Sequence, residues 1–361
     1  MLKISTYTKT GETAATAYYR LYQYLKLITA EYHHHKMLAD NVYEKVMPIY
    51  TKPIVVKVFI FIYVYIRVFY QLLSDIWWRP DIIIISRRLI NRFCPISYKW
   101  MLWYLKYKGT KIIWDFDDNI IETREISRKS FSFFCSISDY IIVASPNNKN
   151  MIATEYQDKT IILPTTDGDM YKKFSNEISS WRKNRYCDEI ILAWVGTSVS
   201  LEYVKKICPL VENAAVRLCH KKIILKVICN LPLKYKPKHF TLENIRWDRN
   251  IAIQELLHSH VGIMPLENNI KNQGKGGFKL IQYLSIGLPV IGSRVGINED
   301  IIDKANGYLI NDLKDDRWCT TIVKYASNLK EWESMSANAT LKWNKTYSFE
   351  YNLKFWRQLI K

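Results

Sequence analysis

Short apolar, β-branched runs alternate with longer helical patterns along nearly the whole chain. This alternation is typical of βαβ units, in which helices join parallel strands and cover the faces of a sheet. The first half predicts strands at residues 3–7, 81–85, 111–114, 140–144 and 160–163. The second half predicts strands at residues 190–195, 223–228, 245–247, 261–264, 289–292 and 307–310. The sequence therefore predicts an α/β protein built on parallel sheets.

The chain has 361 residues, which exceeds the usual size of one domain and fits two of about 150 to 200 residues. The strand pattern restarts after a turn-rich stretch at 164–169 and a polar segment that follows it. We expect a first domain at residues 1–170 and a second at 171–345. Residues 346–361 form an apolar-rich helical pattern that needs a surface to pack on, and we expect this tail to return to the first domain.

Basic residues outnumber acidic ones by 52 to 34, which gives a formal net charge of +18. Such a surface attracts phosphates, nucleic acid or an anionic membrane. The seven cysteines form no C-x-x-C pair, and the N-terminus shows no secretory signal, so a cytoplasmic protein is expected. No basic motif interleaved with aromatic residues is apparent, so a nucleic-acid partner is not expected.

Residues 54–73 are almost entirely aliphatic or aromatic and are long enough to cross a bilayer. On a helical wheel, however, Lys57, Arg67 and Gln71 fall within one sector of about 80°. A charge near mid-membrane costs about 2.5 to 3.5 kcal/mol on insertion scales, which disfavours a span. The stripe fits either a helix packed on a sheet or one that lies in a membrane interface.

Eight of the twelve glycines lie between Gly262 and Gly307. Within this region Gly274-Lys-Gly-Gly opens onto a helix expected from about Phe278, and the N–H groups and positive end of a helix suit a diphosphate. Lys275 and Lys279 add two ammonium groups. The plainer alternative is that the glycines form tight turns and the lysines face solvent, since the loop lacks the G-K-[ST] of a P-loop.

The run GKGGFKLIQYLSIGLPVIGSRVGINEDII resembles the nucleotide-sugar-binding domain of retaining GT-B glycosyltransferases, in the large bacterial family 4 that makes polysaccharides and lipopolysaccharides. It is closest to a branch with a GFKLxQYxxxGxPV core. The resemblance implies two Rossmann-like domains whose parallel sheets face each other across a cleft, retention of anomeric configuration and no required cofactor or metal. The residues expected to bind the nucleotide-sugar donor are Gly196, Thr197, Ser198, Gly274, Gly276, Gly277, Phe278, Gln282, Gly296, Ile297, Asn298 and Asp300.

This chain departs from the family pattern at several of these positions. The family's paired glutamates fall at Gly274 and Gln282, so neither carboxylate is present. Gln282 can still hydrogen-bond ribose hydroxyls without charge. Thr197 stands where many members have arginine, and the missing charge is expected from Lys275 and Lys279. The acid expected in the loop after the 289–292 strand matches Asp300.

Asp115, Asp117 and Asp118 follow a predicted strand directly, in the sequence Trp114-Asp-Phe-Asp-Asp-Asn. Three carboxylates at the carboxyl edge of a sheet could bind a divalent ion, orient acceptor hydroxyls or stabilise an oxocarbenium ion. The plainer alternative is a helix N-cap and turn. The branch carries a similar D-x-D-D, which implies catalytic roles for Asp117 and Asp118 together with Lys275 and Lys279.

The acceptor is expected on the first domain, beside Asp115, Gly11 in the loop at 8–16, and Arg20, which resembles a branch arginine. A solvated helix residue is the alternative for Arg20. The adjacent His33, His34 and His35 cannot converge on one ion, because neighbouring side chains on a strand alternate between faces. No metal site is therefore assigned.

The resemblance predicts transfer of a sugar from a nucleotide-sugar donor to a glycan or lipid-linked acceptor. The net charge and residues 54–73 further predict a peripheral protein on the cytoplasmic face of the inner membrane. Two alternatives remain open: an epimerase or hydrolase of nucleotide sugars on the same fold, and a non-catalytic basic protein that binds membrane or nucleic acid.

Overall fold

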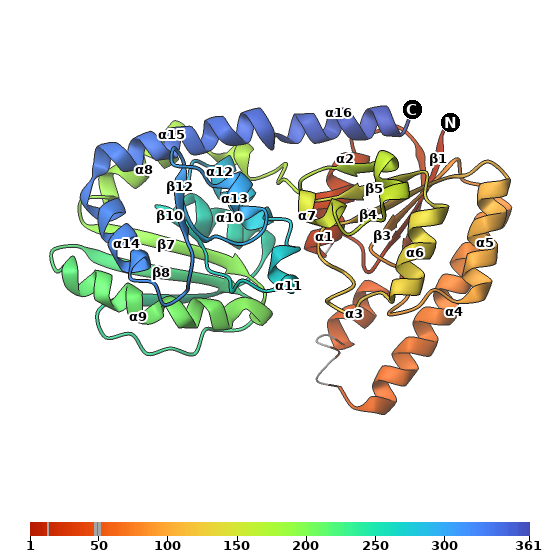
Figure 1. Cartoon of the computed structure of the whole chain (residues 1–361), viewed down its shortest axis with the longest axis horizontal. Coiled ribbons are helices and arrows are strands. Elements are labelled where there is room, and N and C mark those ends of the chain that lie inside the picture. Colours follow the sequence, from red (N-terminus) through yellow and green to blue (C-terminus); the bar gives the residue numbers. More distant parts are fainter. Residues whose placement is uncertain (13, 47–48, 50–51) are drawn as a thin grey trace. The chain divides into compact units, whose positions relative to one another are not determined.

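The computed structural model describes residues 1–12, 14–46, 49 and 52–361. Contacts within the chain define two compact units. The N-terminal unit comprises residues 1–165, 274–276 and 352–361, and the C-terminal unit comprises residues 166–273 and 277–351. Each unit contains a six-stranded, wholly parallel sheet flanked by helices (Figure 1), which confirms the predicted fold class.

The sheet of the N-terminal unit has the strand order β2-β1-β3-β4-β5-β6. Its strands are β1 (Lys3–Thr8), β2 (Glu31–Lys36), β3 (Ile82–Ser86), β4 (Lys111–Phe116), β5 (Tyr140–Val143) and β6 (Thr160–Ile162). The central strands are buried on both sides and read as apolar runs; β3, for example, is Ile-Ile-Ile-Ile-Ser, with every residue buried.

Strand β2 is absent from the sequence prediction, which left residues 31–36 unassigned. Its sequence, Glu-Tyr-His-His-His-Lys, is polar, and it lies at the edge of the sheet with β1 as its one partner. Polar residues suit an edge strand, so apolar patterning does not reveal it. The side chains alternate as expected: His34 contacts Thr6 on one face, while His35 contacts Asp75 on the other.

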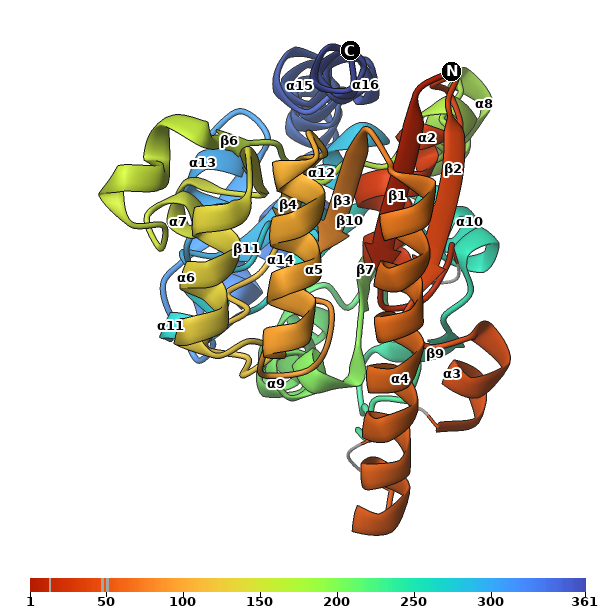
Figure 2. The same cartoon turned by 90° about the vertical axis from the view of Figure 1, so that its right-hand side faces the viewer.

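The helices of the N-terminal unit begin with short segments after β1: α1 (Ala15–Ala17), a π-helical turn (Tyr18–Tyr22) and α2 (Gln23–Leu25). They continue with α3 (Asp40–Val46), α4 (Ile54–Trp78), α5 (Ile96–Tyr107), α6 (Arg128–Ile137), α7 (Pro146–Lys149) and a 3₁₀ segment (Thr154–Lys159). Helices α4, α5 and α6 lie side by side over one face of the sheet (Figure 2). Local caps set their starts: Ser127 accepts a hydrogen bond from Ser130 N at α6, and Ser145 caps α7 ahead of Pro146.

The sheet of the C-terminal unit has the order β12-β11-β10-β7-β8-β9. Its strands are β7 (Glu189–Gly196), β8 (Lys222–Cys229), β9 (Thr241–Arg246), β10 (Val261–Met264), β11 (Val290–Ser293) and β12 (Gly307–Ile310). Its helices are α8 (Asn176–Arg185), α9 (Leu201–Arg217), α10 (Arg249–Leu257), α11 (Ile270–Gln273), α12 (Phe278–Ser285), α13 (Asn298–Ile301), α14 (Arg317–Ser327) and α15 (Leu329–Thr346), with 3₁₀ segments at Tyr171–Lys173 and Ser198–Ser200. The last helix, α16 (Phe349–Leu359), runs from this unit into the N-terminal one.

Candidate functional site

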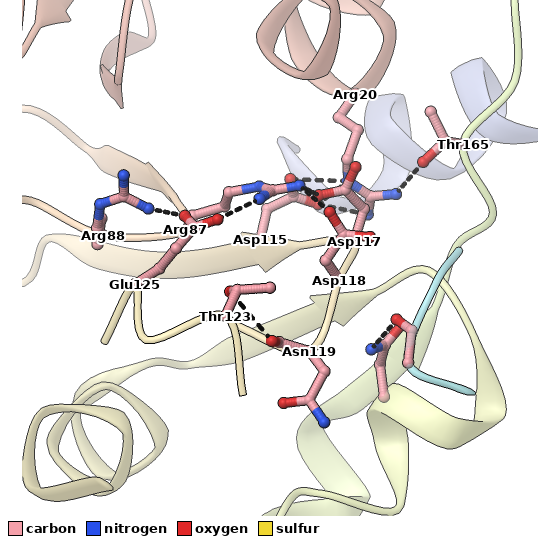
Figure 3. Close-up of polar contacts among 12 residues, drawn as sticks. Arg20, Arg87, Arg88, Asp115, Asp117, Asp118, Asn119, Thr123, Glu125 and Thr165 are labelled. Atoms are coloured by element: carbon pink, nitrogen blue, oxygen red, sulfur yellow. Dashed lines mark hydrogen bonds and ion pairs between the residues drawn. The ribbon is translucent and has the colours of Figure 1, made fainter. Parts of the chain in front are cut away.

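Asp115, at the end of β4, is held by Arg20 in a fully buried ion pair. Arg20 donates from Nε to both Asp115 oxygens, at 3.0 and 2.9 Å, and from Nη2 to Oδ1 at 2.6 Å. Its Nη1 donates to Leu163 O at 3.2 Å and to Thr165 Oγ1 at 2.7 Å (Figure 3). Burial alone lowers the pKa of Arg20, but Asp115 raises it above its ordinary value. The alternative that Arg20 is a solvated helix residue is therefore wrong.

Asp117 and Asp118 are joined by Arg87, a residue that the sequence analysis missed. Arg87 Nη2 lies 2.5 Å from Asp117 Oδ1 and 2.6 Å from Asp118 Oδ2, and Nη1 lies 2.9 Å from Glu125 Oε1 (Figure 3). Arg88 forms a second ion pair with Glu125. Arg87 and Arg88 directly follow β3, which adjoins β4 in the sheet. Two basic residues immediately after a predicted strand are the sequence pattern that could have identified Arg87 as a site residue. No helix begins at Asp117 or Asp118, so the N-cap part of the alternative is wrong, although a turn does follow at residues 120–124.

The two carboxylates differ in acidity. Burial raises the pKa of Asp117 because it outweighs the attraction of Arg87, and the neighbouring Asp118 adds to the rise. Burial acts in the same direction on Asp118, but attraction to Arg87 and to Lys275 outweighs it and lowers the pKa of that carboxyl. Of the two carboxyls, Asp117 is therefore the one that protonates more readily as the pH falls.

Residues Gly274–Gly276 pack against this acidic cluster, within the N-terminal unit. A Cβ at Gly274 would lie 2.4 Å from Asn119 Cβ, and one at Gly276 would lie 2.9 Å from Asp117 O. Asn148 Nδ2 donates to Gly274 O at 3.0 Å. At Gly274 the backbone approaches Asn119 too closely for a side chain to fit without displacing it. Lys275 interacts electrostatically with Asp118.

Lys279 has different neighbours from Lys275, although both were assigned to one phosphate site. Its Nζ lies over the Trp194 ring, 4.4 Å from the centroid, and a Cβ built at Gly196 would be 2.5 Å from that Nζ. Gly196 ends β7, so Lys279 lies at the carboxyl edge of the C-terminal sheet. Ser198 N in the same loop donates to Asn230 Oδ1 at 2.9 Å, while the adjacent Thr197 is exposed.

Helix α12 begins after Gly277, whose φ of 68° is in the left-handed region and favours glycine. A Cβ there would lie 2.4 Å from Ile301 Cδ1, which ties the start of α12 to α13. The predicted helix start near Phe278 is thus confirmed. The loop after β11 also uses a left-handed glycine, Gly296, whose Cβ would lie 2.4 Å from Gln273 O.

The remaining residues predicted to bind the nucleotide-sugar donor include both buried and exposed side chains. Ile297 is buried, and Asn298 is buried with its Nδ2 donating to Ser293 O at 2.9 Å, whereas Asp300 is exposed. Gln282 is buried, and its Nε2 donates to Asp167 Oδ2 at 2.8 Å. Burial raises the pKa of Asp167 despite the hydrogen bonds that it accepts. That contact uses one of the two N–H donors of the Gln282 amide.

Gly11 lies at the carboxyl end of β1, where its N donates to Asp40 Oδ1 at 3.3 Å. The loop predicted at 8–16 includes residue 13, which lies outside the described residues.

His33, His35 and Asp75 place ligand atoms within 4.8 Å of one another, so these three could hold a metal ion. Asp75 already accepts hydrogen bonds from Ser5 Oγ at 2.8 Å and Tyr7 OH at 2.7 Å. These hydrogen bonds compensate for the loss of water around its buried carboxylate.

No protein-family model matches the sequence, and no curated protein matches it. Solved structures do match. HepE from Anabaena in complex with UDP aligns with a TM-score of 0.67 at 10% identity, over 100% of this chain and 99% of HepE. A glycosyltransferase from Rickettsia africae aligns with a TM-score of 0.64 at 12% identity, over 100% and 98% of the two chains. Sucrose-phosphate synthase from Thermosynechococcus elongatus aligns with a TM-score of 0.60 at 12% identity, over 99% of each chain.

At these identities the likeness shows the fold. The chain has the GT-B fold, in which two Rossmann-like units are each built on a parallel sheet.

Proposed function

We propose that the protein is a glycosyltransferase that moves a sugar from a nucleotide-sugar donor to a hydroxyl of a glycan or lipid-linked acceptor. The observation that carries the proposal is the position of Lys279. Its ammonium group is held over Trp194 and beside Gly196, and the residue lies in the first turn of α12, at the carboxyl edge of the C-terminal sheet. Open α/β sheets bind nucleotides at this edge. HepE has been solved with UDP-glucose, so a uridine diphosphate sugar is the proposed donor.

In this proposal Lys279 and the N-terminus of α12 stabilise the negative charge that develops on the departing diphosphate. The bond between the anomeric carbon and the phosphate oxygen breaks, and a bond to the acceptor oxygen forms on the same face of the sugar. The acceptor proton passes to a phosphate oxygen, and the anomeric configuration is retained. Stabilisation of charge on the leaving group is the main catalytic contribution expected.

The N-terminal unit is the proposed acceptor-binding unit. Asp118, whose carboxyl pKa is lowered by attraction to Arg87, is suited to accept a hydrogen bond from an acceptor hydroxyl. Arg20 is proposed as a positioning residue, because its nitrogens all donate to protein acceptors and fix Asp115. Synthesis of cell-surface polysaccharide or lipopolysaccharide is the proposed setting.

Turnover of a panel of UDP-, GDP-, ADP- and CMP-linked sugars tests the proposal. We expect Lys279→Met to lower kcat by about a hundredfold, since loss of one group that stabilises developing charge has effects of this size. Lys205→Met, a change at an exposed lysine on α9, is the matched control and should leave kcat unchanged. Equal turnover by the Lys279 variant and the wild type would remove Lys279 from the phosphate site.

Stabilisation by nucleotides separates the proposal from its alternatives. A donor-binding enzyme gains thermal stability from UDP, by about 2.7 kcal/mol at a hundredfold excess over Kd. If no nucleotide raised Tm, the enzyme proposal would fail in favour of a non-catalytic protein. An epimerase or hydrolase would release a free product from the donor when no acceptor is present.

A further inference from the structure

Helices α4 and α5 expose apolar faces that the fold does not cover. Both lie on the same face of the N-terminal sheet and contact each other (Figure 2). Helix α4 buries a stripe of Ile60, Val64, Val68 and Leu72, which belongs to the core of this unit. By length and composition α4 could also cross a membrane, and it is the one such helix in the described part of the chain.

The opposite side of α4 is apolar and exposed. Phe59, Ile62, Ile66, Tyr70 and Trp77 fall within a sector of about 80° on a helical wheel. The exposed fraction reaches 68% for Phe59 and 83% for Trp77. The first turns of α4 also extend beyond the neighbouring helices (Figure 2). A soluble helix normally presents polar residues on this side, so α4 has the reverse of the usual pattern.

Helix α5 repeats this arrangement. Ile96, Trp100, Trp103 and Tyr107 recur at helical spacing and are exposed, while Tyr98, Leu102 and Leu105 are buried on the other side. Because both helices cover the same face of the sheet, their exposed sides both point away from it. We refer to Phe59, Ile62, Ile66, Tyr70, Trp77, Ile96, Trp100, Trp103 and Tyr107 as the α4–α5 face.

The polar stripe of α4 does not lie on this face. Arg67 Nε and Gln71 Nε2 both donate to Lys36 O, at 2.8 and 3.1 Å, and so fasten the helix to the end of β2. An open groove of about 490 Å³ lies beside the face, lined by Tyr63, Ile66, Arg67, Tyr70, Gln71 and Ser74. Arg67 is the one charged residue of that lining.

The charges near the α4–α5 face are mainly positive. Of the four basic residues on the two helices, Lys57 and Arg67 belong to the polar stripe of α4, while Lys99 and Lys106 lie on α5; the one acid, Asp75, is fully buried. Lys106 forms an ion pair with Asp139. Exposed Arg79 and Lys108 follow the ends of the two helices. Tryptophan and tyrosine favour the headgroup region of a bilayer, and basic residues favour an anionic leaflet.

We propose that the α4–α5 face docks the protein onto an anionic phospholipid surface, with both helices lying in the plane of the interface. This surface goes beyond the proposed transfer reaction. A membrane span by α4 would expose the core side chains of the sheet and separate Asp75 from Ser5, Tyr7 and His35. Pairing with a second copy would bring together the exposed basic residues that border the two faces, such as Arg79 and Lys108, and an anionic surface avoids this repulsion.

Co-sedimentation of the full chain with vesicles tests the docking surface. At low salt we expect the wild type to bind phosphatidylglycerol vesicles more tightly than phosphatidylcholine vesicles, and salt to weaken the binding. The double variant Trp100→Ser/Trp103→Ser should bind about a hundredfold more weakly, since each lost tryptophan removes about a tenfold contribution. Both side chains are exposed, so the variant should keep the wild-type Tm.

The matched control is Val216→Ser/Leu341→Ser, which changes two exposed apolar residues on α9 and α15 and should bind vesicles like the wild type. The proposal would be overturned if the wild type stayed in the supernatant, or if the tryptophan variant bound equally well. It would also be overturned if the wild type formed a dimer and bound no vesicles while the tryptophan variant was a monomer. The Tm shift with UDP should persist in the variant, so failure of docking and failure of the proposed function are distinguishable.

Discussion

Single residues in this protein are positioned by contacts that are distant in the sequence. Arg182 is fully buried, and among the described residues no carboxylate pairs with it. Its nitrogens donate to Leu256 O, Leu257 O and Ile286 O, at the carboxyl ends of α10 and α12. These helix ends carry partial negative charge and stabilise the cation. Burial nevertheless lowers the pKa of Arg182 to about 9.

Because His260 is buried, we expect the C-terminal unit to lose stability in acid. It accepts from Ile191 N at 3.0 Å and contacts Arg182 O at 3.0 Å, and burial lowers its pKa to about 3. Between pH 6.5 and 3 the unfolded state binds a proton that the folded state does not. Stability from this residue is therefore complete above pH 6.5 and falls by about 1.4 kcal/mol per pH unit as the pH drops.

Urea unfolding at several pH values between 7 and 5 measures this slope. His260→Gln removes the titrating group, so its unfolding free energy should depend less on pH than that of the wild type. His239→Gln, at an exposed histidine, should retain the wild-type slope. Identical slopes in all three proteins would contradict the assignment to His260.

Arg87 should control the acidity of Asp118. Arg87→Ala removes the attraction that lowers the Asp118 pKa, so the acidic limb of the pH–rate profile should move to higher pH. We also expect kcat to fall by about a hundredfold, because Asp117 and Asp118 lose the group that positions them. Arg128→Ala, at an exposed arginine, serves as the control. If the acidic limb of the profile stayed at the same pH, Asp118 would not be the group whose protonation determines its position.

At the scale of elements, α4 packs on the sheet, which was one of the two alternatives for its polar stripe, whereas β2 was not predicted. Asp75 joins them: it lies on α4 and accepts hydrogen bonds from Ser5 and Tyr7 of β1, while His35 of β2 lies 3.0 Å away. This one buried carboxylate therefore connects a helix to two strands. Desolvation also raises the pKa of Tyr7 well above its ordinary value, and Asp75 adds to that rise.

Asp75→Asn should destabilise the N-terminal unit by about 3 kcal/mol, because hydrogen bonds to a buried charge are lost and donors remain unpaired. Urea denaturation followed by circular dichroism measures the change. Asp158→Asn, at an exposed position, should alter stability by less than about 0.5 kcal/mol. A loss at Asp75 as small as that of the control would show that the carboxylate contributes little.

At the scale of the whole molecule, the end of the last helix, α16, packs within the N-terminal unit. Residues 352–361 belong to that unit, together with residues 1–165. Asn352 Nδ2 donates to Tyr24 OH at 3.1 Å and to Pro164 O at 2.7 Å, and Trp356 is completely buried beside Tyr24.

Trp356→Ala should lower the unfolding free energy by about 3 to 5 kcal/mol, the usual effect of removing a buried large aromatic side chain. Thermal unfolding should show a lower Tm for this variant. Tyr351→Ala, at an exposed aromatic residue of the same helix, should leave Tm close to that of the wild type. Equal melting of both variants would mean that α16 contributes little to this unit.

The sequence by itself determined the α/β class, ten of the twelve strands and the glycine-rich start of α12, because apolar runs and glycine turns are local patterns. The strand predicted at 245–247 overlaps β9 only at its end. Only the tertiary structure decided the partners of Arg20 and Arg87, the edge strand β2 and the outward apolar face of α4. Each of these depends on residues far apart in the chain: Arg20 meets Asp115 and Thr165, and Arg67 meets Lys36. Periodicity shows that a helix has two sides, but it does not show which side the sheet covers.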